Sequence, residues 1–147
     1  MHSLSKTLIA ISLFSLFAGC GASGPAMVKV TGTVTLDGTP VDGASVVFMP
    51  AITGKPAQGK TDAAGKFALN TDPSKPEDGA QEGEYIVTVR GVRTPGVQAN
   101  PDGTSGDNSQ YREEWFVPKH FSNPASSGLR QTVAKGMQPV ELKLTSK

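Results

Sequence analysis

The sequence predicts an all-β protein: a single antiparallel β-sandwich of seven short strands, preceded by an N-terminal export signal. Several short segments alternate apolar and polar residues with a period of two and are rich in Val and Thr, which is typical of half-buried strands. Glycine and proline, 17 and 11 of the 147 residues, separate these segments as turns. No apolar pattern with the 3.6-residue period of a helix is longer than two helical turns.

Residues 1–19 are expected to be a signal peptide. Residues 7–18 are apolar and uncharged, and this run is much shorter than the about 20 residues that a membrane-spanning helix requires. The small residues Ala18 and Gly19 come directly before Cys20. This arrangement resembles the lipobox of bacterial lipoproteins, which implies cleavage before Cys20 and lipid modification of its thiol.

Cys20 is the only cysteine of the chain. One cysteine excludes an internal disulfide and a Cys-rich zinc site. A free thiol on an exported protein is prone to oxidation, and thioether formation removes that liability. Because each buried methylene contributes about 0.8 kcal/mol, several acyl chains give stable anchoring. We therefore expect a membrane-anchored lipoprotein of the cell envelope, on its periplasmic or cell-surface side, with residues 20–26 as a short flexible tether.

The β-sandwich domain is expected to span residues 27–147. In the first segment, Val28, Val30, Val34 and Leu36 alternate with Lys and Thr, and the next strand is a short apolar run that Pro50 ends. The seven expected strands are residues 27–36, 44–49, 59–61, 66–69, 83–90, 129–134 and 139–145.

Turn residues and alternation place the remaining strands. Gly65 supplies the left-handed position of the turn between the third and fourth strands. In the fifth strand, Tyr85 is expected to bury its ring and to send its hydroxyl to a backbone partner. Gly32 interrupts the first strand, where a bulge or a close backbone approach is expected. The last strand alternates Val140, Leu142 and Leu144 with polar residues.

A long loop at about 91–128 holds no convincing regular element and contains four prolines. Such a stretch is usually functional or disordered. Residues 91–112 are rich in Gly, Asn, Asp and Ser and are expected to be mobile. Residues 113–128 hold aromatic side chains and are expected to pack along the domain.

Four segments, residues 30–34 with 37–44, residues 61–67 and residues 83–89, together resemble the carboxypeptidase regulatory-like, or transthyretin-like, β-sandwich domains, an Ig-like architecture. Residues 118–124 look like a further element of short lipoproteins of this type in planctomycete-like bacteria. The resemblance implies an accessory, adhesive or carbohydrate-contacting module. We therefore expect a non-catalytic binding or structural module.

An enzyme is not expected. The hydroxyisourate hydrolases related to this fold use several histidines, an arginine and a C-terminal Tyr-Arg-Gly-Ser segment. After loss of the signal only His120 remains, beside Phe121 in a loop, and a Ser-His or Cys-His pair has little to work with. The alternative that stays open is a small hydrolase, or an accessory subunit of an envelope enzyme.

The segment Tyr111-Arg112-Glu113-Glu114-Trp115-Phe116 contains the only Trp. Aromatic residues and Arg are enriched at protein interfaces, and aromatic rings also serve as platforms for carbohydrate. Tyr111, Arg112, Trp115 and Phe116 are therefore candidates for contact with an envelope protein or a polysaccharide. The alternative, which we favour, is that Trp115 and Phe116 cover one open end of the sandwich.

No metal site, cofactor or nucleic-acid partner is expected. Residues 102–108 supply oxygen ligands but lack the spacing of a calcium loop, and the acidic residues Asp72, Glu77, Asp78 and Glu82 are interrupted by Lys75. The chain has 14 Lys and Arg against 13 Asp and Glu, so it lacks the excess of basic charge that nucleic acid requires.

Overall fold

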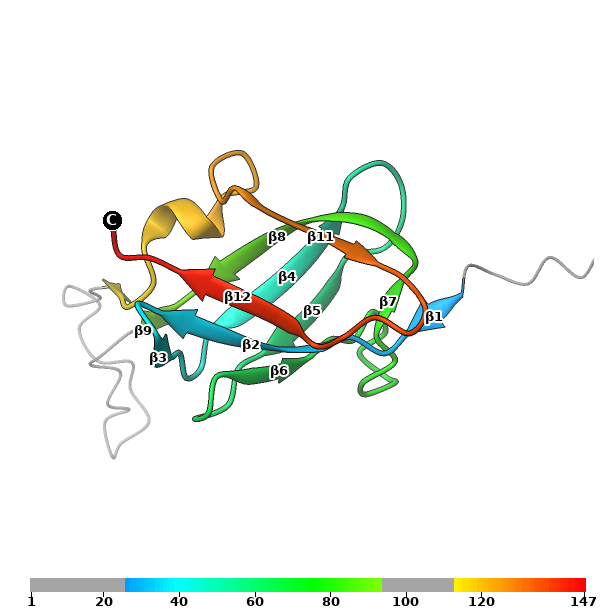
Figure 1. Ribbon diagram of the computed structural model, residues 1–147, viewed down its shortest axis with the longest axis horizontal. Helices are drawn as coiled ribbons and strands as arrows, with labels where there is room; N and C mark the ends of the chain where they lie inside the picture. The colour runs from blue at the N-terminus through cyan, green and yellow to red at the C-terminus, as the bar shows by residue number, and fades with distance from the viewer. Residues whose placement is uncertain (1–25, 94–112) are drawn as a thin grey trace, which may run out of the picture.

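Two four-stranded sheets stack face to face, and the alternating apolar residues of their strands meet between them (Figure 1). The computed structural model describes residues 26–93 and 113–147. One sheet has the order β11 (Leu129–Val133), β8 (Gly83–Arg90), β4 (Ser45–Pro50) and β5 (Ala57–Lys60). The other has the order β12 (Val140–Leu144), β2 (Thr31–Leu36) and β3 (Thr39–Pro40), with β6 (Lys66–Ala68) also paired to β2.

Two short strand pairs lie at the ends of the sandwich. β1 (Met27–Val28) pairs with β7 (Ala80–Gln81), and β9 (Val92–Arg93) pairs with β10 (Glu114–Trp115). The chain then forms one turn of 3₁₀ helix, η2 (Lys119–Ser122). None of the helical structure in the described residues is long and apolar enough to cross a membrane.

The predicted all-β class is confirmed, and each of the seven expected strands has a counterpart, in order β2, β4, β5, β6, β8, β11 and β12. The strand number differs, since the described residues also contain five strands of two residues each: β1, β3, β7, β9 and β10. The expectation of no regular element at about 91–128 was wrong for β9, β10 and η2. A strand of two residues is too short to show an alternating pattern in the sequence. It is defined by its pairing with another segment of the chain.

The expected strand over residues 27–36 is divided into β1 and β2. Met27 and Val28 pair with Gln81 and Ala80, whereas β2 pairs with β12, β3 and β6. The alternation of apolar residues does not reveal the division, because Val28 in β1, Val30 in the break and Val34 in β2 are all buried.

The expectation of a wholly antiparallel sandwich was wrong at one pair, because β12 lies parallel to β2. Their register sets Val140 beside Gly32 and Leu144 beside Leu36. A tight hairpin forces its two strands to be antiparallel, but β12 and β2 are joined through most of the chain. No local connection therefore dictates their relative direction.

Three aromatic rings occupy the middle of the core. The ring centroid of Phe48 lies 6.4 Å from that of Phe67 in the opposite sheet and 5.8 Å from that of Tyr85 on the neighbouring strand. Each contact is tilted, which aromatic rings prefer over a face-to-face stack. The other largest fully buried side chains belong to the same core cluster: Leu69, Leu144, Val30, Val34, Val46, Val87, Val89, Val117 and Val133.

Gly32 leaves room for the ring of Phe67. A Cβ atom at this position would overlap the carbonyl oxygen of Val140 and would lie 2.6 Å from Phe67 Cζ. Real Cβ atoms do not approach other atoms so closely, so a side chain here would push β6 or β12 away from β2. The close backbone approach predicted at Gly32 is confirmed.

Tyr85 combines a buried ring with a satisfied hydroxyl. The residue is 3% exposed, and its hydroxyl donates a hydrogen bond of 3.0 Å to the carbonyl oxygen of Gln81. This confirms the expected backbone partner. Burial raises the pKa of Tyr85 because the ionised phenolate is poorly solvated there.

We predict that Tyr85→Phe lowers the free energy of unfolding by about 1 kcal/mol at neutral pH, through loss of this hydrogen bond. Because the pKa is raised in the folded state, the contribution of Tyr85 is fully present below about pH 10 and is lost as the pH rises through the folded-state pKa. Urea unfolding from about pH 7 to about pH 11 measures the difference between wild type and variant. A difference that stays constant above about pH 10 would contradict the assignment.

Candidate functional site

The described part of the long loop gathers aromatic and cationic side chains at one end of the sandwich. β10 pairs with β9 so that Glu114 lies beside Arg93 and Trp115 beside Val92. This pairing brings the chain back over the end of β8, and η2 follows directly. We call Arg90, Arg93, Trp115, Phe116 and Lys119 the Trp115 cluster.

Cations face both aromatic rings of the Trp115 cluster. The guanidinium carbon of Arg90 lies 5.4 Å from the Trp115 ring centroid, and Lys119 Nζ lies 5.1 Å from it. The guanidinium carbon of Arg93 lies 4.7 Å from the Phe116 ring centroid. Such contacts contribute about 0.5–1 kcal/mol each at exposed sites. The rings thus hold three long, flexible cationic side chains in defined positions.

A close crossing at Gly91 anchors this end to the core. The carbonyl oxygen of Gly91 accepts hydrogen bonds from the amides of Phe116, at 3.1 Å, and Val117, at 3.4 Å. A Cβ atom on Gly91 would lie within 2.6 Å of both of these side chains. Val117 is 1% exposed and Phe116 is partly buried against the core. Phe116 and Val117 therefore cover the open end of the sandwich.

Trp115 is half-buried, and its indole N–H has an unusual environment. The indole nitrogen is buried, and no hydrogen-bond acceptor reaches it from the described residues. A buried donor without a partner costs about 1–3 kcal/mol of desolvation. The indole is therefore held by its contacts with Arg90 and Lys119 rather than by a hydrogen bond.

The structure brings together two of the five residues that the sequence singled out. Trp115 and Phe116 are neighbours in the Trp115 cluster. Cys20, Tyr111 and Arg112 lie outside the described residues, so their predicted roles stay predictions.

Sequence reasoning missed the cationic members of the Trp115 cluster. Alternation in β8 places Tyr85, Val87 and Val89 inward, so it also places Arg90 outward at the end of the strand. The outward direction of Arg90 could therefore be predicted from the sequence. Its contact with Trp115 could not, because Trp115 comes 25 residues later in the chain and only the β9–β10 pairing sets it beside β8.

Arg90 also forms an ion pair with Glu113, whose carboxylate oxygen lies 3.4 Å from the guanidinium nitrogen. Both side chains are more than half exposed, so the pair contributes little stability. His120, the only histidine left after the expected cleavage, is exposed, and its ring lies 4.0 Å from that of Phe121.

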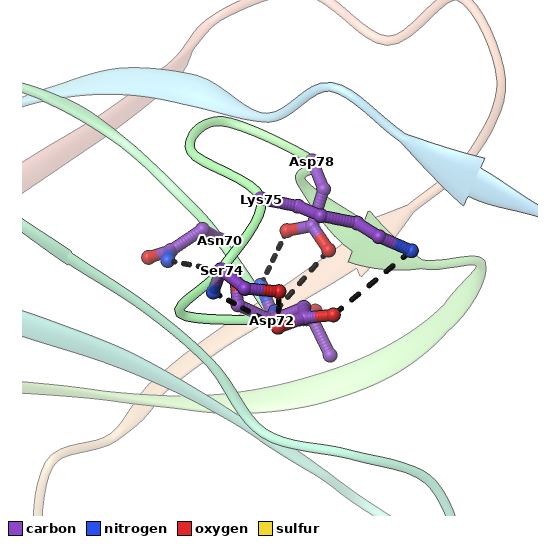
Figure 2. Close-up of polar contacts among 6 residues, drawn as sticks. Asn70, Asp72, Ser74, Lys75 and Asp78 are labelled. Carbon is purple, nitrogen blue, oxygen red and sulfur yellow. Dashed lines mark hydrogen bonds and ion pairs between the residues drawn. The ribbon is translucent and has the colours of Figure 1, made fainter.

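In the acidic loop after β6, the carboxylates of Asp72 and Asp78 form hydrogen bonds to other residues of the same loop (Figure 2). Asp78 accepts hydrogen bonds from the backbone amides of Thr71, at 2.6 Å, and Asp72, at 3.2 Å. Asp72 accepts bonds from the amide and hydroxyl of Ser74 and forms an ion pair with Lys75. These partners, the Ser74 hydroxyl first, lower the pKa of Asp72. The two carboxylates therefore have a structural role in the loop.

A groove of about 710 Å³ runs along β2, β5 and β6. Its lining mixes apolar residues such as Phe67 with polar ones, among them Thr31, Thr33, Lys60, Lys66, Asn70 and Glu77. Within residues 26–93 and 113–147, no group of three or more His, Cys, Asp or Glu side chains is placed to hold a metal ion. Residues 102–108, which supply oxygen ligands but lack the spacing of a calcium loop, lie outside the described residues.

Comparison with known proteins does not assign the chain to a family. No protein-family model and no protein of curated function matches it. A solved 9R-lipoxygenase from Cyanothece PCC8801 is 16% identical over an alignment that covers 96% of this chain, with a TM-score of 0.35. The chain spans 18% of the length of that protein. A TM-score this low supports no inference about fold or activity.

We predict that Trp115→Phe changes the free energy of unfolding by less than about 1 kcal/mol, because the lost apolar contact is offset by removal of an unpartnered buried N–H. In the same segment, Val117→Ala should cost about 2 kcal/mol, because it leaves a cavity at a fully buried site. Urea unfolding of both variants measures this order. A larger loss for Trp115→Phe than for Val117→Ala would show that the indole N–H has a stabilising partner.

Proposed function

We propose that the chain is an exported lipoprotein, anchored through Cys20, that presents a β-sandwich of the carboxypeptidase regulatory-like type as a non-catalytic binding module at the cell envelope. The lipobox-like segment before Cys20 supports export and anchoring. The all-β fold is compatible with the family resemblance of residues 27–145.

The observation that carries this proposal is that the chain enters the domain at one end and the Trp115 cluster lies at the other. The segment from Cys20 enters the sandwich at β1, whereas β9 and η2, with the Trp115 cluster, lie at the opposite end (Figure 1). A domain held at one end and carrying aromatic and cationic side chains at the other presents those side chains away from the membrane. This arrangement suits a display module.

The chemistry of the Trp115 cluster favours a protein partner with acidic groups. Trp and Arg are enriched among the residues that dominate protein interfaces. The exposed Arg93 and Lys119 lie against the rings, so little side-chain entropy is lost when they pair with a partner's carboxylates, whereas Arg90 already pairs with Glu113.

A polysaccharide partner is the second candidate, and it fits the groove along β2, β5 and β6 better than Trp115. A sugar that stacks on Trp115 has to displace Arg90 or Lys119 from the ring. The groove instead offers hydroxyl, amide and amino groups from Thr31, Asn70 and Lys66, which suit the hydroxyl groups of a sugar.

We predict that Cys20→Ala abolishes membrane association and leaves the unprocessed precursor, because the acylated thiol is the proposed anchor and cleavage site. Cell fractionation and intact-protein mass spectrometry measure both effects. Ser23→Ala, in the same segment, is the matched control and should be processed and anchored normally. A processed, membrane-bound Cys20→Ala protein would refute lipid anchoring.

We also predict that a photo-crosslinking amino acid placed at the exposed His120 captures an envelope protein in intact cells, whereas the same probe at Lys135, near the β1 end, does not. Adding Lys119→Glu should reduce the His120 crosslink at least about tenfold, since a reversed charge opposes acidic groups of the partner. Crosslinks of equal yield at both positions would contradict a partner site at the Trp115 cluster.

A further inference from the structure

The exposed apolar side chains of the domain gather toward the end where the chain arrives from Cys20. Within the described residues, the large hydrophobic residues that are exposed are Met27, Met49 and Ile52, at 42%, 39% and 89%. Met27 lies in β1, and Met49 and Ile52 lie at the end of β4 and in the loop between β4 and β5. Figure 1 places β1 and this loop toward the same end of the molecule.

Contacts join these residues into one surface, which we call the β1 end: Met27, Ile52, Gln81 and Met137. Gln81 pairs with Met27 across β1 and β7. Gln81 and Ile52 line the same cavity, of about 270 Å³. Met27 and Met137 line a second cavity, of about 420 Å³. Apolar side chains and two hollows therefore occupy a continuous part of the surface.

The short segment between Cys20 and the domain keeps this surface near the proposed anchor. Ala26 follows Cys20 by six residues, so a fully extended chain between them spans at most about 22 Å. This distance is smaller than the about 30 Å thickness of the hydrocarbon core of a bilayer. If Cys20 carries acyl chains, the β1 end is the part of the domain nearest to the lipid headgroups.

We propose that the β1 end lies on the lipid surface, with Ile52 inserted among the acyl chains at the headgroup boundary and Met27 in contact with the headgroups. This inference rests on the proposed anchoring through Cys20 and deepens it: the anchor holds the domain in one orientation instead of leaving it free to rotate. The Trp115 cluster then points away from the membrane.

The charges around the β1 end suit an interfacial position. Lys29, Lys55 and Lys135 are exposed there, and long lysine side chains can extend from an apolar surface to the phosphates. Lys55 follows Ile52 by three residues in the same loop. Two exposed acidic residues, Glu82 and Glu84, line the cavity beside Ile52, so the three lysines outnumber the carboxylates there, and Glu82 also accepts a hydrogen bond of 3.0 Å from the amide of Lys135.

The test reads the depth of single tryptophans in the mature lipoprotein. The protein is purified from membranes, its acylation is verified by mass spectrometry, and it is reconstituted into phosphatidylcholine vesicles brominated on the acyl chains. Wild type carries Trp115 alone, at the far end. The double variant Ile52→Trp with Trp115→Phe carries one tryptophan at the β1 end, and its melting temperature confirms folding.

We expect the bromine atoms to quench the emission of the double variant at least about twofold more strongly than that of wild type, because interfacial residues reach about 5–10 Å into the headgroup–acyl boundary. Ile52→Asp should abolish the protection of the residues 51–56 loop from protease in vesicles and leave acylation unchanged. Acylated proteins whose tryptophan emission is equally unquenched in the two cases would overturn this inference alone. A protein without acyl groups would overturn the proposed function, and this inference with it.

Discussion

The contact of Phe48 with Phe67 across the two sheets is the interaction on which the sandwich depends. These rings, with Tyr85, fill the middle of the core, and the valines of β2, β4 and β8 pack around them. The contact is available only because Gly32 has no side chain, so that the Phe67 ring lies directly against β2. One small residue thus sets the spacing of β6, β2 and β12, and through Phe67 the spacing of the two sheets.

The two ends of the sandwich differ in chemistry because different connections close them. At one end, the chain returns over Gly91, and the covering residues Phe116 and Val117 bring Trp115 and its cations with them. At the other end, β1 and β7 form a short ribbon under a loop with an exposed isoleucine. In the proposed orientation, an apolar end faces lipid and a cationic, aromatic end faces a partner. The β-sandwich between them acts as a rigid spacer.

Several polar side chains have a structural role, because they accept hydrogen bonds from backbone amides. Asp72 and Asp78 hold the loop after β6 by accepting bonds from its own backbone amides. Thr61, buried between β5 and β6, accepts the amide of Ala44 at 2.8 Å. Within a sandwich of this size, loops have few apolar contacts of their own, so hydrogen bonds from Asp, Ser and Thr define their shape. A cluster of carboxylates in such a loop is therefore weak evidence for metal binding.

Local patterns in the sequence determined the all-β class, the seven main strands and the inward faces of residues such as Tyr85, Val87 and Leu142, because a period of two reports burial directly. They also determined the close approach at Gly32 and the partner type of the Tyr85 hydroxyl. Only the tertiary structure decided the parallel direction of β12, the two-residue strands and the meeting of Arg90 with Trp115. These features join segments far apart in the chain, and no local pattern records which distant segment a strand edge or a ring will meet.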